Sequence, residues 1–132
     1  MTSDKSEYIG NWLFRANEDI AVIHSLTSID LEFYTSTICF HAQQAVEKFL
    51  KAFLIYHNKE IERTHNLYYL QKKCSEINNS IGRIDLKELN FFGISVRYPD
   101  EFYIPSVEEA KEYISIAQKI ESLVISIVLE GK

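Results

Sequence analysis

Apolar and polar residues recur with a helical period along most of the chain. The segment 33–57, FYTSTICFHAQQAVEKFLKAFLIYH, is the clearest case, because it contains no Gly and no Pro over about seven turns. On a helical wheel its apolar residues from Ala42 to Tyr56 fill one half. The other half holds His41, Gln43, Gln44, Glu47, Lys48 and Lys51. So wide an apolar arc predicts a central helix that contacts more than one neighbouring element.

The same period predicts five helices. They run over Lys5–Leu26, over Leu31–His57, from Thr64, from near Asp85 to near Arg97, and from Pro105 and Ser106 almost to Gly131. Asn58 is a candidate helix terminator, Thr64 a candidate N-cap, and Ser106 with Glu109 a capping-box pattern, as is Asp85 with Glu88. Residues 77–82 predict a loop, and residues 97–105 predict an irregular connector. Short connections between helices favour an up-and-down bundle, so we expect an all-α fold.

Composition limits the class of protein. A chain of 132 residues, with 46% hydrophobic and 25% charged residues, predicts one folded domain over residues 1–132. The net charge of −5 argues against broad affinity for nucleic acid but leaves room for a local basic site. The start MTSDKSEYIG is polar and no apolar run approaches about 18 residues, so we expect no signal peptide and no membrane span. Cys39 and Cys74 are expected to be buried thiols in a cytoplasmic protein.

The polar half of segment 33–57 contains the first candidate site. His41, Gln44, Lys48 and Lys51 follow spacings of three, four and three, so they form one stripe on a helix. One interpretation is a solvated face. Asp19, Arg15 and Glu18 lie off the apolar face of the first helix and are also expected to be solvated. The other interpretation is a groove that binds phosphates through two lysines, an imidazole and an amide. Glu47 precedes Lys51 by four residues and is expected to neutralise part of its charge.

The connector before the last helix contains the second candidate site. Arg97, Tyr98, Asp100, Glu101 and Tyr103 cluster there, and Arg with Tyr in a loop suits anion binding or aromatic stacking. The alternative is that Arg97 pairs locally with an acidic neighbour and the rings pack on the bundle. His65 either bonds to a helix end or faces a ligand. The sequence contains no metal-ligand spacing, Gly-rich phosphate loop or nucleophilic triad pattern, so we expect no metal and no cofactor.

Three segments together resemble the HEPN family of small helical domains. They are FHAQQAVEKFLKAFLI at 40–55, RTHNL at 63–67 and RYPDEFYIPSVEEA at 97–110, and they follow the order of the family's motifs. The resemblance covers nearly the whole chain. It implies a five-helix fold with a four-helix up-and-down core and commonly a homodimer. It also implies a minimal nucleotidyltransferase as partner, in a toxin–antitoxin-like or nucleotide-handling system.

Some HEPN proteins are metal-independent ribonucleases, in which an Arg and a His four to six residues apart meet their dimer mates. From Arg97, the matching intervals fall on Phe102, Tyr103 and Ile104, none of which is His. Arg15, Arg63 and Arg83 also lack a His at these intervals. The ribonuclease motif is therefore missing as written. Arg97 with His41 or His65 is the substitute that the chain offers, with Arg97 stabilising the phosphorane and an imidazole acting as base.

Three hypotheses follow. The first is a non-catalytic or weakly catalytic HEPN partner of a nucleotidyltransferase that binds a nucleotide or another phosphate. The residues assigned to that site are His41, Gln44, Lys48, Lys51, His65, Arg97, Tyr98 and Tyr103. The second is a metal-independent endoribonuclease toxin that uses Arg97 and His41. The third is a helical dimerisation module without a ligand.

Overall fold

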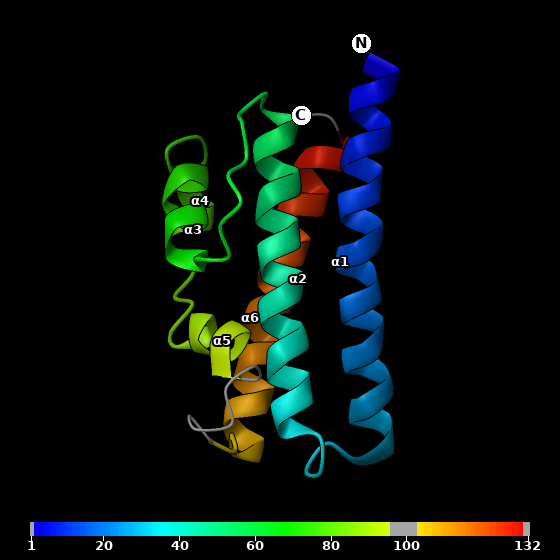
Figure 1. Ribbon diagram of the computed structural model, residues 1–132, viewed down its shortest axis with the longest axis vertical. Coiled ribbons are helices and arrows are strands. Elements are labelled where there is room, and N and C mark those ends of the chain that lie inside the picture. The colour runs from blue at the N-terminus through cyan, green and yellow to red at the C-terminus, as the bar shows by residue number, and fades with distance from the viewer. Residues whose placement is uncertain (1, 96–102, 131–132) are drawn as a thin grey trace.

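The protein is all-helical over the residues that the structure describes. It is a computed structural model, which describes residues 2–95 and 103–130 (Figure 1). The elements are α1 (Thr2–Asp30), α2 (Thr35–Tyr56), α3 (Leu67–Ser75), α4 (Asn79–Gly82), the 3₁₀ helix η1 (Leu89–Phe91), α5 (Phe92–Ser95) and α6 (Val107–Glu130). The predicted all-α fold class is confirmed.

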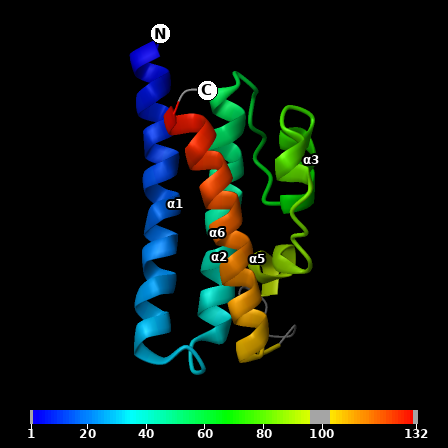
Figure 2. The same cartoon turned by 180° about the vertical axis from the view of Figure 1, so that it is seen from behind.

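Helix α2 lies at the centre of the bundle. It packs against α1, α3, η1, α5 and α6, which confirms the central helix expected from its wide apolar arc. Figures 1 and 2 show α1 antiparallel to α2, whereas α6 runs in the same direction as α2. The turn of residues 31–34 forces α1 and α2 to be antiparallel, because so short a connection reverses the chain. The connection 57–106 contains the short helices and is long enough for α6 to start from the same end as α2.

The core follows the apolar stripes of the three long helices. Its most completely buried large side chains include Phe49, Phe53, Leu50 and Leu54 of α2 and Ile120 of α6. Fully burying such a side chain contributes about 1.5–3 kcal/mol, so each of these positions favours folding.

Two predicted helix ends are confirmed by their hydrogen bonds. At the start of α6, the N–H of Glu109 donates to Ser106 Oγ at 3.0 Å and the N–H of Ser106 donates to Glu109 Oε1 at 3.0 Å. This is the reciprocal capping box expected from the sequence. Beyond the end of α2, Asn58 has a φ of 63°, the left-handed conformation that terminates a helix.

The helix expected from Thr64 begins later than predicted, at Leu67. The N-cap is Asn66, whose side chain accepts hydrogen bonds from the N–H groups of Tyr68 (3.0 Å) and Tyr69 (3.2 Å). Asn satisfies two free N–H groups of the first turn at once, and Thr64 lies two residues too early to do so. Thr64 Oγ1 instead accepts from the N–H of Asn66 at 3.1 Å.

The prediction of one continuous helix from Asp85 was wrong, as was the prediction of a plain loop over 77–82. Asp85 Oδ1 accepts from the N–H of Lys87 at 2.9 Å, and Lys87 has a φ of 51°. An Asp that bonds its own backbone two residues on favours a turn over a helix start. The chain then forms only η1 and α5, while the expected loop contains α4. The predicted end of that helix near Arg97 lies outside the described residues.

Candidate functional site

The polar half of α2 is largely buried rather than solvated. Gln43, Glu47 and Lys51 are buried, and so is Asp19 of α1, which was expected to be solvated. The prediction for Asp19 was therefore wrong, whereas Arg15 and Glu18 are exposed as expected and form an ion pair at 3.1 Å. Asp19 lies three residues after Ala16 and four before Ile23, both of which are buried, so its position on the apolar face of α1 was the signal that it would be buried.

Asp19 forms the first of two carboxylate-centred clusters. Its Oδ1 lies 2.8 Å from His41 Nδ1, and its Oδ2 lies 2.8 Å from Lys48 Nζ. His41 and Lys48 are seven residues apart, which is two helical turns, so both project from the same face of α2 toward α1. We call Asp19, His41 and Lys48 the α1–α2 cluster.

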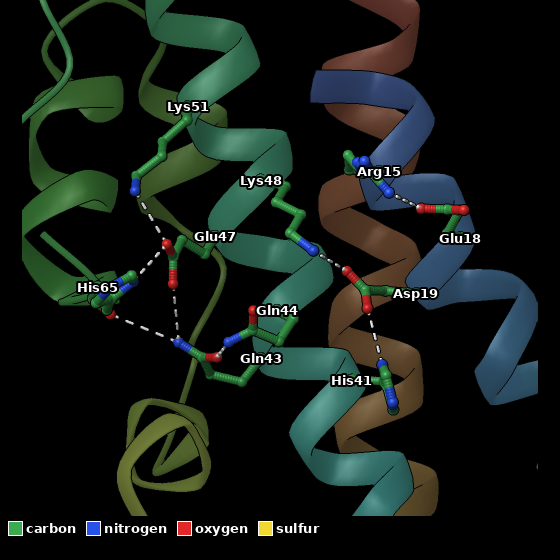
Figure 3. A network of polar contacts seen from close by, with 10 residues as sticks. All are labelled: Arg15, Glu18, Asp19, His41, Gln43, Gln44, Glu47, Lys48, Lys51 and His65. Atoms are coloured by element: carbon green, nitrogen blue, oxygen red, sulfur yellow. Dashed lines mark hydrogen bonds and ion pairs between the residues drawn. The ribbon is translucent and has the colours of Figure 1, made fainter. Parts of the chain in front are cut away.

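Glu47 forms the second cluster, on the side of α2 that faces the segment between α2 and α3 (Figure 3). Its Oε2 lies 3.0 Å from Lys51 Nζ and 2.8 Å from His65 Nδ1, and its Oε1 accepts from Gln43 Nε2 at 3.4 Å. The predicted pairing of Glu47 with Lys51 is confirmed. The structure adds His65, which the segment between α2 and α3 brings to the same carboxylate. We call Gln43, Glu47, Lys51 and His65 the α2–α3 cluster.

Gln43 ties the second cluster to its surroundings. Its Oε1 accepts from Gln44 Nε2 at 2.7 Å, and its Nε2 also lies 3.5 Å from the carbonyl oxygen of His65. Gly93 of α5 packs directly on this amide, since a Cβ added at Gly93 would lie 2.7–2.9 Å from the atoms of the Gln43 amide. The absence of a side chain at Gly93 therefore lets α5 cover Gln43 and shield its amide from water.

Both histidines are oriented by a carboxylate through Nδ1. In a neutral imidazole whose Nδ1–H donates to a carboxylate, Nε2 is left as a proton acceptor. This is the carboxylate–imidazole arrangement of general acid–base catalysis. His65 is the more accessible of the two, with 64% of its side chain exposed against 23% for His41. Lys48 has three N–H donors, of which the contact with Asp19 uses one.

The charges of the two clusters balance when both imidazoles are neutral. Lys48 and Lys51 are matched by Asp19 and Glu47, and every one of these four groups is in an ion pair. An anion that binds here therefore interacts with donors whose charge is already compensated. Protonation of His41 or His65 adds the positive charge that a phosphate prefers.

The remaining predicted site residues are Arg97, Tyr98 and Tyr103. Arg97 and Tyr98 lie outside the described residues. The Tyr103 hydroxyl donates to Glu109 Oε1 at 2.5 Å and so supports the cap of α6. This bond, and then the backbone N–H of Ser106, lower the pKa of the Glu109 carboxyl below its ordinary value.

Metal and thiol chemistry find no support in the described part of the chain. Within residues 2–95 and 103–130, no group of three or more His, Cys, Asp or Glu side chains is placed to hold a metal ion. Cys39 and Cys74 are buried free thiols, as predicted, and burial raises the pKa of each to about 12. Of the helices described, none has the length and apolar character that crossing a membrane requires.

Comparisons with known proteins agree with this architecture. The model of the family described as the HEPN domain matches residues 9–128. A crystal structure described as an archaeal HEPN homologue is 24% identical in sequence and superposes with a TM-score of 0.66. The alignment covers 91% of this chain and 97% of the archaeal one. A comparison with curated proteins gives no match.

Proposed function

The chain belongs to the HEPN family, and from this premise we propose that it is the partner of a minimal nucleotidyltransferase in a two-component, toxin–antitoxin-like system. We further propose that the polar face of α2 binds a phosphate group of a nucleotide or an RNA. In this proposal the connector that follows α5 contributes one cation, Arg97, and two aromatic rings, Tyr98 and Tyr103.

One observation supports the binding site above all others. Two buried carboxylates hold His41, Lys48 and His65 by one polar atom each. This leaves Nε2 of each imidazole and two of the Lys48 N–H groups with bonding capacity. Donors whose side chains are already oriented lose little conformational entropy when a ligand binds. On a polar face that only contacts water, side chains would not need buried carboxylates to fix their orientation.

The partner is tested by co-purification. An affinity-tagged chain is recovered from its native cells, and the associated proteins are identified and quantified by mass spectrometry. We expect a nucleotidyltransferase in stoichiometric amount. A lone homodimer with neither partner nor bound nucleotide would contradict the proposal and favour the dimerisation module.

The binding site is tested by calorimetry with nucleotides. Lys48→Ala is expected to weaken binding about tenfold, because a charge-assisted hydrogen bond to phosphate is lost. The matched control is Lys72→Ala, which removes an exposed lysine from α3 and is expected to bind as the wild type does. Absence of heat with both the wild type and Lys48→Ala would rule out the site.

The carboxylate–imidazole pairs favour a second function, metal-independent cleavage of RNA. An imidazole Nε2 takes the proton of a ribose 2′-hydroxyl, and the 2′-oxygen then attacks the adjacent phosphorus. The bond from phosphorus to the 5′-oxygen breaks, a protonated group returns a proton to that oxygen, and a 2′,3′-cyclic phosphate remains. Arg97 is assigned to stabilise the charge that develops on the phosphorane.

The second function is tested with RNA in the presence of a chelator. Arg97→Ala, His41→Ala and His65→Ala are each expected to reduce cleavage about 100-fold, within the usual contribution of a general acid or base. His24→Ala removes an exposed histidine from α1 and is the matched control. Intact RNA at high protein concentration, or cleavage that survives Arg97→Ala, would exclude this function.

A further inference from the structure

A polar cavity lies away from the α2 site, between α6 and the segment that joins α4 to η1. Figure 2 shows this segment passing beside α6. The cavity has a volume of about 490 Å³, and its polar lining consists of Arg83, Asp85, Lys87, Glu112, Ser115 and Lys119. Ile84 and Ile116 line its apolar part. A second cavity of about 420 Å³ shares Ile84, Ser115 and Lys119 with it and extends along α6. We call the two together the α6 groove.

The charges in the α6 groove leave a local positive excess. Three cations line it and two carboxylates face them, in a chain whose net charge is −5. Glu112 Oε2 is paired with Lys87 Nζ at 3.4 Å, and Asp85 Oδ1 accepts from the backbone N–H of Lys87. Arg83 and Lys119 form no ion pair with any residue that the structure describes. Both therefore have their full charge and their donors available for an anion.

The backbone at the rim of the groove is held in an uncommon conformation. Lys87 has a φ of 51°, which is rare for a residue other than Gly, Asn or Asp. Three hydrogen bonds maintain it. Tyr68 Oη donates to the carbonyl oxygen of Lys87, the N–H of Glu88 donates to Tyr113 Oη at 3.1 Å, and Asp85 accepts from Lys87. Such conformations persist where the surroundings determine them, and they cluster at ligand-binding sites.

We propose that the α6 groove binds the phosphate group of a small phosphate monoester. The guanidinium of Arg83 matches two phosphate oxygens at once, and Lys119 adds a second charge from the α6 wall. The Ser115 hydroxyl is a third donor on that wall. The space exceeds what a lone phosphate fills, and the two isoleucines provide an apolar surface for the organic part of the ligand.

The probe that tests this site is ribose 5-phosphate, added to the ¹⁵N-labelled full chain and followed by NMR. We expect saturable shifts in the amides of residues 83–87 and 115–119, with affinity that falls as salt is added. Ribose, which lacks the phosphate, is expected to leave these amides unchanged. Equal shifts with ribose, equal binding of succinate, or ribose 5-phosphate shifts confined to α1 and α2 would each overturn the proposal.

Charge-neutral variants locate the binding atoms. Arg83→Gln and Lys119→Gln are each expected to weaken ribose 5-phosphate binding about tenfold, because each removes a charge-assisted hydrogen bond. Lys111→Gln makes the same change at an exposed position of α6 outside the cavity and is the matched control. In Lys48→Gln, which alters the α2 face, the shifts of residues 83–87 and 115–119 are expected to persist, which separates this site from the α2 face. Unchanged affinity in the Arg83→Gln, Lys119→Gln double variant would overturn the assignment.

Discussion

The two carboxylate-centred clusters on α2 have similar chemistry but different surroundings. In the α1–α2 cluster, the partners of Asp19 remain near water, with 24% of the Lys48 side chain and 23% of the His41 side chain exposed. In the α2–α3 cluster, Lys51 is only 7% exposed and Glu47 6%. An ammonium group that has lost its carboxylate can be hydrated at Lys48 and not at Lys51. From this comparison we expect the exposure of the lysine partner, and not the contact distance, to decide how much each carboxylate contributes to stability.

Glu47→Ala is expected to have the largest effect. It leaves the Lys51 ammonium buried without its carboxylate, which costs about 3–5 kcal/mol in the free energy of unfolding. Chemical denaturation measures this loss. The double variant Glu47→Leu, Lys51→Met removes both charges and is expected to recover most of the stability. If the single and double variants are equally unstable, buried charge is not the cause.

Asp19→Ala is expected to have a smaller effect, about 1.5–3 kcal/mol, typical of hydrogen bonds to charged groups. Lys48 and His41 can turn toward water after the change, so no buried charge remains. Chemical denaturation again gives the free energy of unfolding, and the loss is compared with the loss in Glu47→Ala. A loss equal to or larger than that of Glu47→Ala would break the comparison between the clusters.

The Glu109 carboxylate at the start of α6 extends the comparison to the pH dependence of stability. Ser106→Ala removes an N-cap and is expected to cost about 1 kcal/mol at pH 7. The pKa of Glu109 is lowered in the folded protein by Tyr103 and Ser106, so the charged cap stabilises the fold above the unfolded pKa of about 4.5. This contribution disappears as the pH falls through the lower folded pKa. The stability difference between wild type and Glu109→Gln, whose amide carries no charge, is therefore expected to shrink on acidification, and a constant difference would argue against the charged cap.

Arg15→Ala is expected to have the smallest effect, below about 0.5 kcal/mol, because its pair with Glu18 is exposed on both sides. Its denaturation midpoint should match that of the wild type closely. Exposed ion pairs contribute about 0–1 kcal/mol. A loss of about 1 kcal/mol or more would therefore show that exposure alone does not rank these ion pairs by their contribution to stability.

Interactions between near neighbours in the chain were predictable. The Glu47–Lys51 pair and the Ser106–Glu109 capping box each span one helical turn, so the backbone spacing already brings the groups together. The segment 85–95 was mispredicted for the opposite reason. Two local patterns compete at Asp85, a capping box with Glu88 and a turn closed on the backbone N–H of Lys87. The turn forms, so Asp85 does not cap a helix.

The sequence by itself determined the three long helices, the central place of α2 and the membership in the HEPN family, because helical period and motif spacing are properties of the chain alone. Only the tertiary structure decided which side chains meet at the site. Asp19 contacts residues 22 and 29 positions away, and His65 contacts Glu47 from 18 positions away. Such contacts depend on how each helix is rotated about its axis and where a loop crosses it. Packing of the whole core sets both of these.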